Sequence, residues 1–161
     1  MIDRPEREER DWPDLAGRLV GGGHVLAVRV YYEDTDFSGV VYHAAYLKFM
    51  ERGRSDFLRL AGVHHHELAS GSHGGELVFA VRHMEIDFLG SAKIDDLLEV
   101  HTRTLEIRGA RLILAQEVRC GDTVLVATTV TVAVVGSDRK PKRVPRIVAD
   151  QLTGIGDARK A

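Results

Sequence analysis

Cysteine is almost absent from this chain, because Cys120 is the single thiol among 161 residues. An internal disulfide is therefore excluded, and a reducing compartment fits best. Long apolar runs are also missing: none approaches the ~20 residues that a membrane-spanning helix needs. The N-terminal segment is charged from its start and lacks the apolar core of a secretory signal. We expect a cytoplasmic protein, and attachment to the inner-membrane surface through a partner stays open.

Neither sign of charge dominates, since the formal net charge is -2. This balance gives no overall attraction to nucleic acid or to an anionic membrane, although a local basic patch is compatible with it. Apolar residues make up 44% and charged residues 29% of the chain, as in ordinary globular proteins. The length is sufficient for one domain with one core.

The chain divides at a glycine triplet, Gly21 to Gly23. Residues 1–23 are rich in charge and proline, so we interpret them as an appendage to a domain that spans residues 24–161. Within the appendage, three apolar residues could form a stripe that docks on the body or on a neighbour: Trp12, Leu15 and Leu19. A frayed tail is the alternative.

Alternation and turn residues predict an α+β domain with one long helix. The expected strands are 24–32, 76–88, 97–107, 112–120 and 123–135, the helix is 42–61, and a last helical turn is 146–152. Tight hairpins are expected at 108–111 and 121–122. The helix must bury its apolar stripe against the sheet, which gives a five-stranded antiparallel sheet wrapped around a central helix, the hotdog arrangement. Exposed sheet edges favour a homodimer, and two dimers packing through their outer faces would form a tetramer.

The helix pattern places six residues on one face at steps of three and four: Tyr42, Tyr46, Phe49, Gly53, Phe57 and Leu60. Glycine costs about 1 kcal/mol within a helix, so we expect Gly53 to permit close packing against the sheet. Gly62 is expected to end the helix.

The most informative segment connects the first strand to this helix. It contains two acids, Asp34 and Asp36, followed by Gly39 and the expected helix start near His43. A helix N-terminus presents unpaired N–H groups that stabilise an oxygen becoming negative during attack on a carbonyl. The segment could therefore combine a catalytic carboxylate with an oxyanion site, but both acids could equally be loop or cap residues.

Residues 28–36 (VRVYYEDTD) and 39–46 (GVVYHAAY) resemble the signature of the 4-hydroxybenzoyl-CoA thioesterase family. The similarity is closest to its YbgC-type branch, acyl-CoA thioesterases associated with the Tol-Pal system. It continues through residues 49–54, 79–84, 95–100 and 108–110 and covers roughly residues 26–150. The resemblance implies hydrolysis of short-chain or aromatic acyl-CoA, with CoA as leaving group and no metal or redox cofactor.

By resemblance, Asp36 is the essential aspartate, acting as nucleophile or as general base. The backbone amide at His43 would polarise the thioester carbonyl, and the His43 side chain would assist Asp36 or position water. Gly39 and Tyr42 would line the substrate site. Phe37 departs from the smaller residue usual in the branch and could reshape the acyl pocket.

Phosphates of CoA need basic partners. A basic segment at residues 139–146 includes Lys142 and Arg143, and Arg108 and Arg111 flank a predicted hairpin. We expect Arg111, Lys142 and Arg143 to hold the nucleotide, with contacts across a subunit boundary included. A solvated arm is the alternative for the basic segment. Acyl carrier protein is a further candidate partner.

Other candidate sites are weaker. Three adjacent histidines, His64 to His66, and His73 lack a recognisable metal-ligand spacing and suggest a solvated loop. Glu51 is expected to pair with Arg52, with Arg54 or with a neighbouring chain. Neither Cys120 nor Ser38 has the surroundings of a nucleophile. The rival functions are a non-catalytic acyl-CoA- or acyl-carrier-protein-binding hotdog protein of the cell-envelope machinery, and a hotdog dehydratase.

Overall fold

The structure is a computed structural model that describes residues 12–64, 70 and 75–157. Its elements, in chain order, are β1 (Arg18–Val20), β2 (Gly23–Arg29), the 3-10 turn η1 (Tyr32–Asp34), α1 (His43–Leu60), β3 (Leu77–Phe88), β4 (Leu97–Arg108), β5 (Arg111–Cys120), β6 (Thr123–Gly136) and α3 (Arg146–Asp157).

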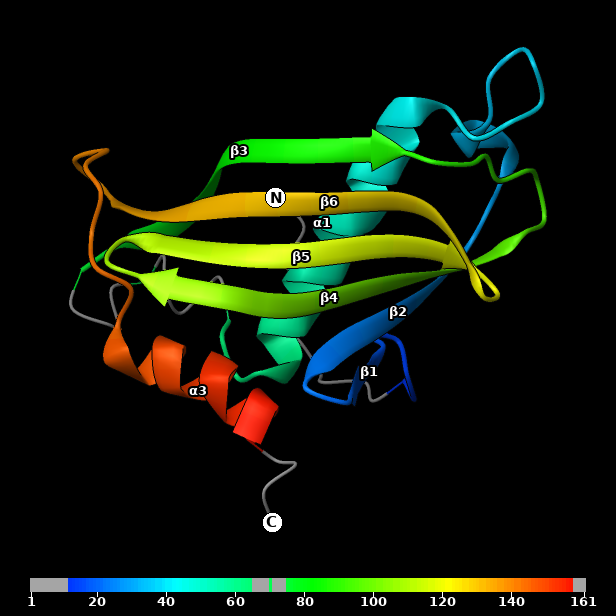
Figure 1. The fold of residues 1–161 in the computed structure, drawn as a ribbon. Helices are drawn as coiled ribbons and strands as arrows, with labels where there is room; N and C mark the ends of the chain where they lie inside the picture. Colours follow the sequence, from blue (N-terminus) through cyan, green and yellow to red (C-terminus); the bar gives the residue numbers. More distant parts are fainter. Residues whose placement is uncertain (1–11, 65–69, 71–74, 158–161) are drawn as a thin grey trace, which may run out of the picture.

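The strands form one antiparallel sheet in the order β1-β2-β4-β5-β6-β3, and α1 crosses one face of it (Figure 1). Two-residue turns set the register of the central strands, because Arg108 pairs with Arg111 and Cys120 pairs with Thr123. Gly109 and Gly121 take the positive φ angles of 59° and 58° that such turns require. The predicted hotdog arrangement and both hairpins are confirmed.

The helix packs closely on the sheet through the glycine in its middle. A Cβ on Gly53 would lie 2.7 Å from Val100 Cγ1, so a larger residue would push α1 away from β4. The predicted burial is wrong for the first and last residues of the apolar stripe. Tyr42 and Leu60 are exposed, because they lie at the helix termini. Gly62, with φ +83°, follows the helix as predicted.

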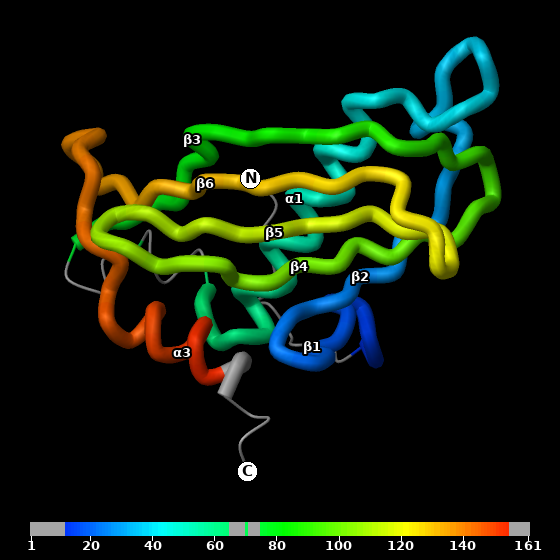
Figure 2. The backbone as a smooth tube through the Cα atoms, viewed as in Figure 1, coloured from blue at the N-terminus to red at the C-terminus, as the bar shows by residue number. Residues whose placement is uncertain are grey.

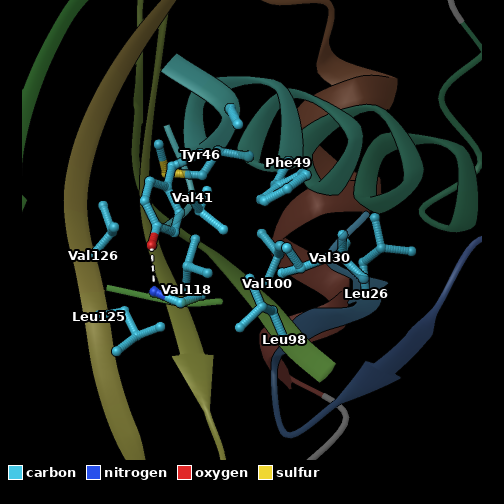
Figure 3. Packing of buried hydrophobic residues seen from close by; sticks show 14 residues of the cluster. Leu26, Val30, Val41, Tyr46, Phe49, Leu98, Val100, Val118, Leu125 and Val126 are labelled. Atoms are coloured by element: carbon cyan, nitrogen blue, oxygen red, sulfur yellow. Dashed lines mark hydrogen bonds between the residues drawn. The ribbon is translucent and has the colours of Figure 1, made fainter. Parts of the chain in front are cut away.

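The core consists of two clusters along α1. Figure 3 shows the first, in which Tyr46 and Phe49 pack against β2, β4 and β5. The second surrounds Phe57 and is closed by α3 through Val148 and Leu152. α3 has twelve residues, so it is longer than the predicted turn at 146–152. The core therefore fixes both ends of α1, and with them the segment that precedes it.

Within the described residues the sheet has six strands, whereas five were predicted. The sixth, β1, comes from the segment interpreted as an appendage and pairs with β2 through a turn at Gly21 and Gly22. His24 holds the segment just before this strand, since its Nε2 lies 2.6 Å from the carbonyl oxygen of Ala16. Burial lowers the pKa of His24.

Candidate active site

The segment between η1 and α1 folds back on itself as a short hairpin (Figure 2, upper right). The Asp36 N–H donates to the Val40 carbonyl at 2.9 Å, and the Gly39 N–H donates to the Asp36 carbonyl at 3.0 Å. Gly39 has φ +83°, the left-handed conformation that closes a three-residue turn and that favours glycine. The sequence pattern therefore holds Asp36 at the base of a turn.

Ser38 determines the state of the Asp36 carboxylate. Its hydroxyl donates to Asp36 Oδ1 at 2.5 Å and its N–H donates to the same oxygen at 2.8 Å. These two hydrogen bonds, the hydroxyl first, lower the pKa of Asp36, so the group is an anion at neutral pH. Within the described residues, no donor bonds Oδ2, which leaves this oxygen available for chemistry.

Asp34, the competing acid, serves the local backbone. Its Oδ2 accepts the N–H of Tyr31 at 2.8 Å, and its carbonyl accepts the N–H of Tyr42 at 2.8 Å. These bonds fix the start of η1 and the entry into α1. Asp34 thus holds the loop together and is half-buried, whereas the side chain of Asp36 is exposed.

The helix begins at His43, directly after the hairpin. Tyr42 has no side-chain cap bond, and within the described residues no acceptor bonds the N–H of His43 or Ala44. The positive end of the helix is therefore open to an anionic oxygen. The His43 ring contacts Tyr42 at a centroid distance of 4.5 Å and Phe88 at 6.1 Å, which builds an aromatic wall beside this end.

A second loop, residues 89–96, supports the hairpin. The Val41 N–H donates to the Ala92 carbonyl at 2.8 Å, and Val40 bridges to Lys93. The Ala92 N–H in turn donates to the buried hydroxyl of Tyr46 at 2.9 Å, the dashed line in Figure 3. Tyr46 was predicted only as a core residue. Its role as an anchor depends on a contact 46 residues away in sequence, and no local signal could have revealed it.

Within one copy of the chain, the residues predicted to bind CoA phosphates lie away from the hairpin that carries Asp36. Arg111 starts β5, at the end of the sheet opposite the hairpin (Figure 2). The twelve residues of β4, a strand about 36 Å long, run between these two ends. Lys142 forms an ion pair with Asp138 at 3.0 Å, and Arg143 is exposed. One copy therefore does not bring these residues to Asp36.

Of the predicted histidine loop, His64 is described, whereas His65, His66 and His73 lie outside the described residues. In the part of the chain that the structure describes, no group of three His, Cys, Asp or Glu side chains is arranged to hold a metal ion. No described helix is long and apolar enough to cross a membrane.

Comparison with known proteins agrees with this fold and loop. The family model of the thioesterase superfamily matches residues 38–127. "Acyl-CoA thioesterase YbgC" of Haemophilus influenzae is 40% identical over 131 residues, which is 81% of this chain and 94% of that protein. "Acyl-CoA thioester hydrolase YbgC" of Escherichia coli is 39% identical over 76% of this chain and 91% of that protein.

A solved structure, a probable thioesterase from Bartonella henselae, is 50% identical, with a TM-score of 0.74 over 76% of this chain and 99% of that one. The hotdog fold, with an acidic loop at the start of its central helix, is that of the hotdog thioesterases. The chain belongs to the thioesterase superfamily, and within it to the YbgC type.

Proposed function

We propose that this chain hydrolyses acyl-CoA thioesters with Asp36 as the acting carboxylate. The observation that carries the proposal is the pairing of an ionised carboxylate with an open helix N-terminus on the two sides of one short hairpin. The Haemophilus influenzae and Escherichia coli relatives are named as acyl-CoA thioester hydrolases, which supports acyl-CoA as the substrate class.

Two routes are compatible with this geometry. Asp36 Oδ2 attacks the thioester carbonyl, expels the CoA thiolate and leaves an anhydride that water then hydrolyses. Alternatively, the carboxylate removes a proton from water, and the resulting hydroxide attacks. In both, negative charge develops on the carbonyl oxygen, and the His43 N–H stabilises it. The products are a free acid and CoA.

The acyl group is proposed to be short or aromatic. The side chains beside the helix start are the aromatic rings of Tyr42, His43 and Phe88, and these rings offer stacking and apolar contact. Phe37 is fully exposed at the tip of the hairpin, where it can cover a bound acyl group. Gly39 has no side chain, so nothing at this position obstructs the approach of the acyl group.

The phosphates of CoA are proposed to bind basic residues of a second copy. A groove of about 680 Å³ is lined by Arg82, Arg108 and Arg111, and within the described residues no carboxylate pairs with these three. Arg111 therefore stays a strong candidate. Lys142 is a weaker one, because Asp138 already neutralises it, and Arg143 is exposed but lies outside this groove.

The test is hydrolysis of a panel of acyl-CoAs, followed with a thiol reagent, by the parent and by Asp36→Asn. Asparagine can still accept the hydrogen bonds from Ser38, so the turn is retained while the charge is lost. We expect kcat to fall at least ~10²-fold. The matched control is Glu33→Gln, which removes an exposed charge from η1 and should leave kcat unchanged.

Full activity of Asp36→Asn on the best substrate would refute the assignment. Binding of acyl-CoA without turnover of any thioester would instead favour the non-catalytic alternative. Hydration of an enoyl-CoA without thioester cleavage would favour the dehydratase.

A further inference from the structure

A short segment, residues 12–17, lies just before β1, and we call it the strap. Two internal hydrogen bonds fold it on itself: the Leu15 N–H donates to the Trp12 carbonyl at 3.2 Å, and the Gly17 N–H donates to the Asp14 carbonyl at 2.9 Å. The strand that follows, β1, has three exposed residues and pairs with β2 at one border of the sheet (Figure 1). No residue of the strap or of β1 is fully buried, so the strap depends on its contacts with the domain beneath it.

One buried side chain holds the strap from below. His24 is 1% exposed, and its Nε2 lies 2.6 Å from the carbonyl oxygen of Ala16. Because a carbonyl oxygen only accepts, Nε2 carries the proton in this contact. Within the described residues, no other hydrogen bond joins the strap to β2 or to α1.

The strap and the His24 ring are packed so closely that glycine is required beside the ring. A Cβ on Gly17 would lie 2.2 Å from the carbonyl oxygen of Val25 and 2.8 Å from His24 Nε2. Gly17 also has φ +75°, a backbone conformation that favours glycine. Residues 16 and 17 therefore cover the Nε2 edge of the ring, and this edge meets water when the strap moves away.

The second ring nitrogen has no partner. His24 Nδ1 is buried and accepts no hydrogen bond within the described residues, and the ring lies 6.0 Å from that of Phe57 on α1. The residues opposite His24 on β1 and β4, Leu19 and Thr102, carry no charge. A proton on Nδ1 would place a positive charge and an unpaired N–H in this site, at a cost in free energy. Burial accordingly lowers the pKa of His24, by more than its contact with Ala16 raises it.

Charged groups around the ring do not remove this cost. On α1, Asp56 raises the pKa of His24, but Arg59 already pairs with this acid. On the strap, Asp14 pairs with Arg18. The other charged or titratable groups line a groove over β4 and β5, where the glutamate pairs with the second arginine: His101, Arg103, Glu117 and Arg119. Each acid beside the ring therefore has a partner other than His24.

We propose that His24 is a pH-sensitive clasp: the neutral ring holds the strap closed, and protonation at Nδ1 releases residues 12–17 while the domain stays folded. Release lets the Nε2 edge of the charged ring reach water. The strap forms one side of a groove of about 1020 Å³, to which β2 and α1 contribute Leu26, Val28 and Leu60. Release therefore opens this groove, and the inference does not depend on the proposed activity.

The closed strap is favoured most above pH 6.5. The pKa of His24 lies below its ordinary value of 6.5 under the strap, and it returns toward that value once the ring is hydrated. The strap is therefore lost as pH falls below 6.5 toward the lower pKa of the closed state. The ratio of closed to released molecules changes about tenfold for each pKa unit that separates the two states.

Trp12 is the single tryptophan of the chain, so its fluorescence anisotropy reports on the strap. We expect the anisotropy of the parent to fall between about pH 8 and about pH 5, while far-UV circular dichroism stays constant. His24→Gln should keep the high anisotropy throughout, because glutamine Nε2 still donates to Ala16 and does not titrate. His101→Gln is the matched control: this half-buried histidine bonds Glu99 and not the strap, so the parental transition should remain.

Gly17→Ala tests the same clasp from the other side. Its Cβ would clash with Val25 and His24, so the strap should be released at about pH 8 and the anisotropy should be low at every pH.

Three outcomes would overturn the proposal. The first is a parental anisotropy that does not change over this pH range. The second is a parental transition in His24→Gln or, if that variant does not fold, in Gly17→Ala. The third is a loss of circular dichroism together with the anisotropy, because the whole domain then unfolds and the strap has no separate release.

Discussion

The hydroxyl of Tyr46 anchors the loop that supports the Asp36 hairpin, and Tyr46→Phe tests whether this contact links the stability of the fold to the proposed activity. The change removes the hydroxyl that accepts the Ala92 N–H at 2.9 Å and keeps the ring that packs on Phe49. Both Tyr46 and Ala92 are buried, so the freed N–H finds no water. An unpaired buried donor costs about 1–3 kcal/mol, and each kcal/mol lowers Tm by about 2–4 °C in a chain of this length.

We therefore expect Tyr46→Phe to lower the free energy of unfolding by about 2 kcal/mol in urea titrations with an unchanged m-value. It should also lower kcat, since Ala92 holds the N–H of Val41 at the base of the hairpin. Parent and variant are compared at equal protein concentration, because dimerisation would shift apparent stability. The control is Tyr31→Phe, whose exposed ring should give a change within about 0.5 kcal/mol. If Tyr46→Phe matches this control in stability and in kcat, the anchor has no energetic role.

Three further predictions follow. Gly53→Ala should lose about 1 kcal/mol in the same titrations, because a clash 2.7 Å from Val100 outweighs the gain in helix propensity; a more stable variant would show that α1 moves freely away from β4. Ser38→Ala should raise the pKa of Asp36 and move the acid limb of the kcat/KM profile to higher pH, and an unmoved limb would separate Ser38 from the chemistry. The folded-state pKa of His24 lies below its ordinary value of 6.5, so its contribution to stability is complete above that pH and is lost as pH falls through the folded pKa. Unfolding free energies measured between about pH 8 and pH 5 should therefore decline less in His24→Gln than in the parent.

Local patterns predicted the elements whose causes are local. Glycines at 109 and 121 set the hairpins, and the three- and four-residue spacing set α1. β1 escaped prediction because a three-residue strand with every residue exposed has no periodicity to detect, and it forms because β2 follows it in the chain. Tyr42 and Leu60 fitted the helical spacing, but spacing does not show where the sheet beneath the helix ends.

For the candidate site, the sequence identified the loop and its acids but not the hydrogen bonds that distinguish them. The choice of Asp36 over Asp34 came from resemblance, and the physical distinction between them lies in hydrogen bonds that two-residue spacing cannot specify. The sequence analysis weighs Ser38 only as a nucleophile, yet an Asp followed two residues later by Ser is a familiar turn pairing that points to the contact with Asp36. The sequence predicts that Arg111, Lys142 and Arg143 hold the CoA phosphates, but the length of β4 separates Arg111 from the hairpin within one copy.

The hydrogen bonds of Ser38 also constrain how Asp36 can act. Both fall on Oδ1, so the carboxylate plane is held by one oxygen while Oδ2 projects without a donor in the described part of the chain. An oxygen fixed in this way is positioned before substrate arrives, which reduces the entropy lost on reaching the reactive geometry. A lowered pKa keeps Asp36 fully ionised, as both proposed routes require, and it weakens the carboxylate both as a base and as a nucleophile. The contact with Ser38 therefore supplies what direct attack and general-base attack would both need from Asp36, an ionised carboxylate held in one orientation.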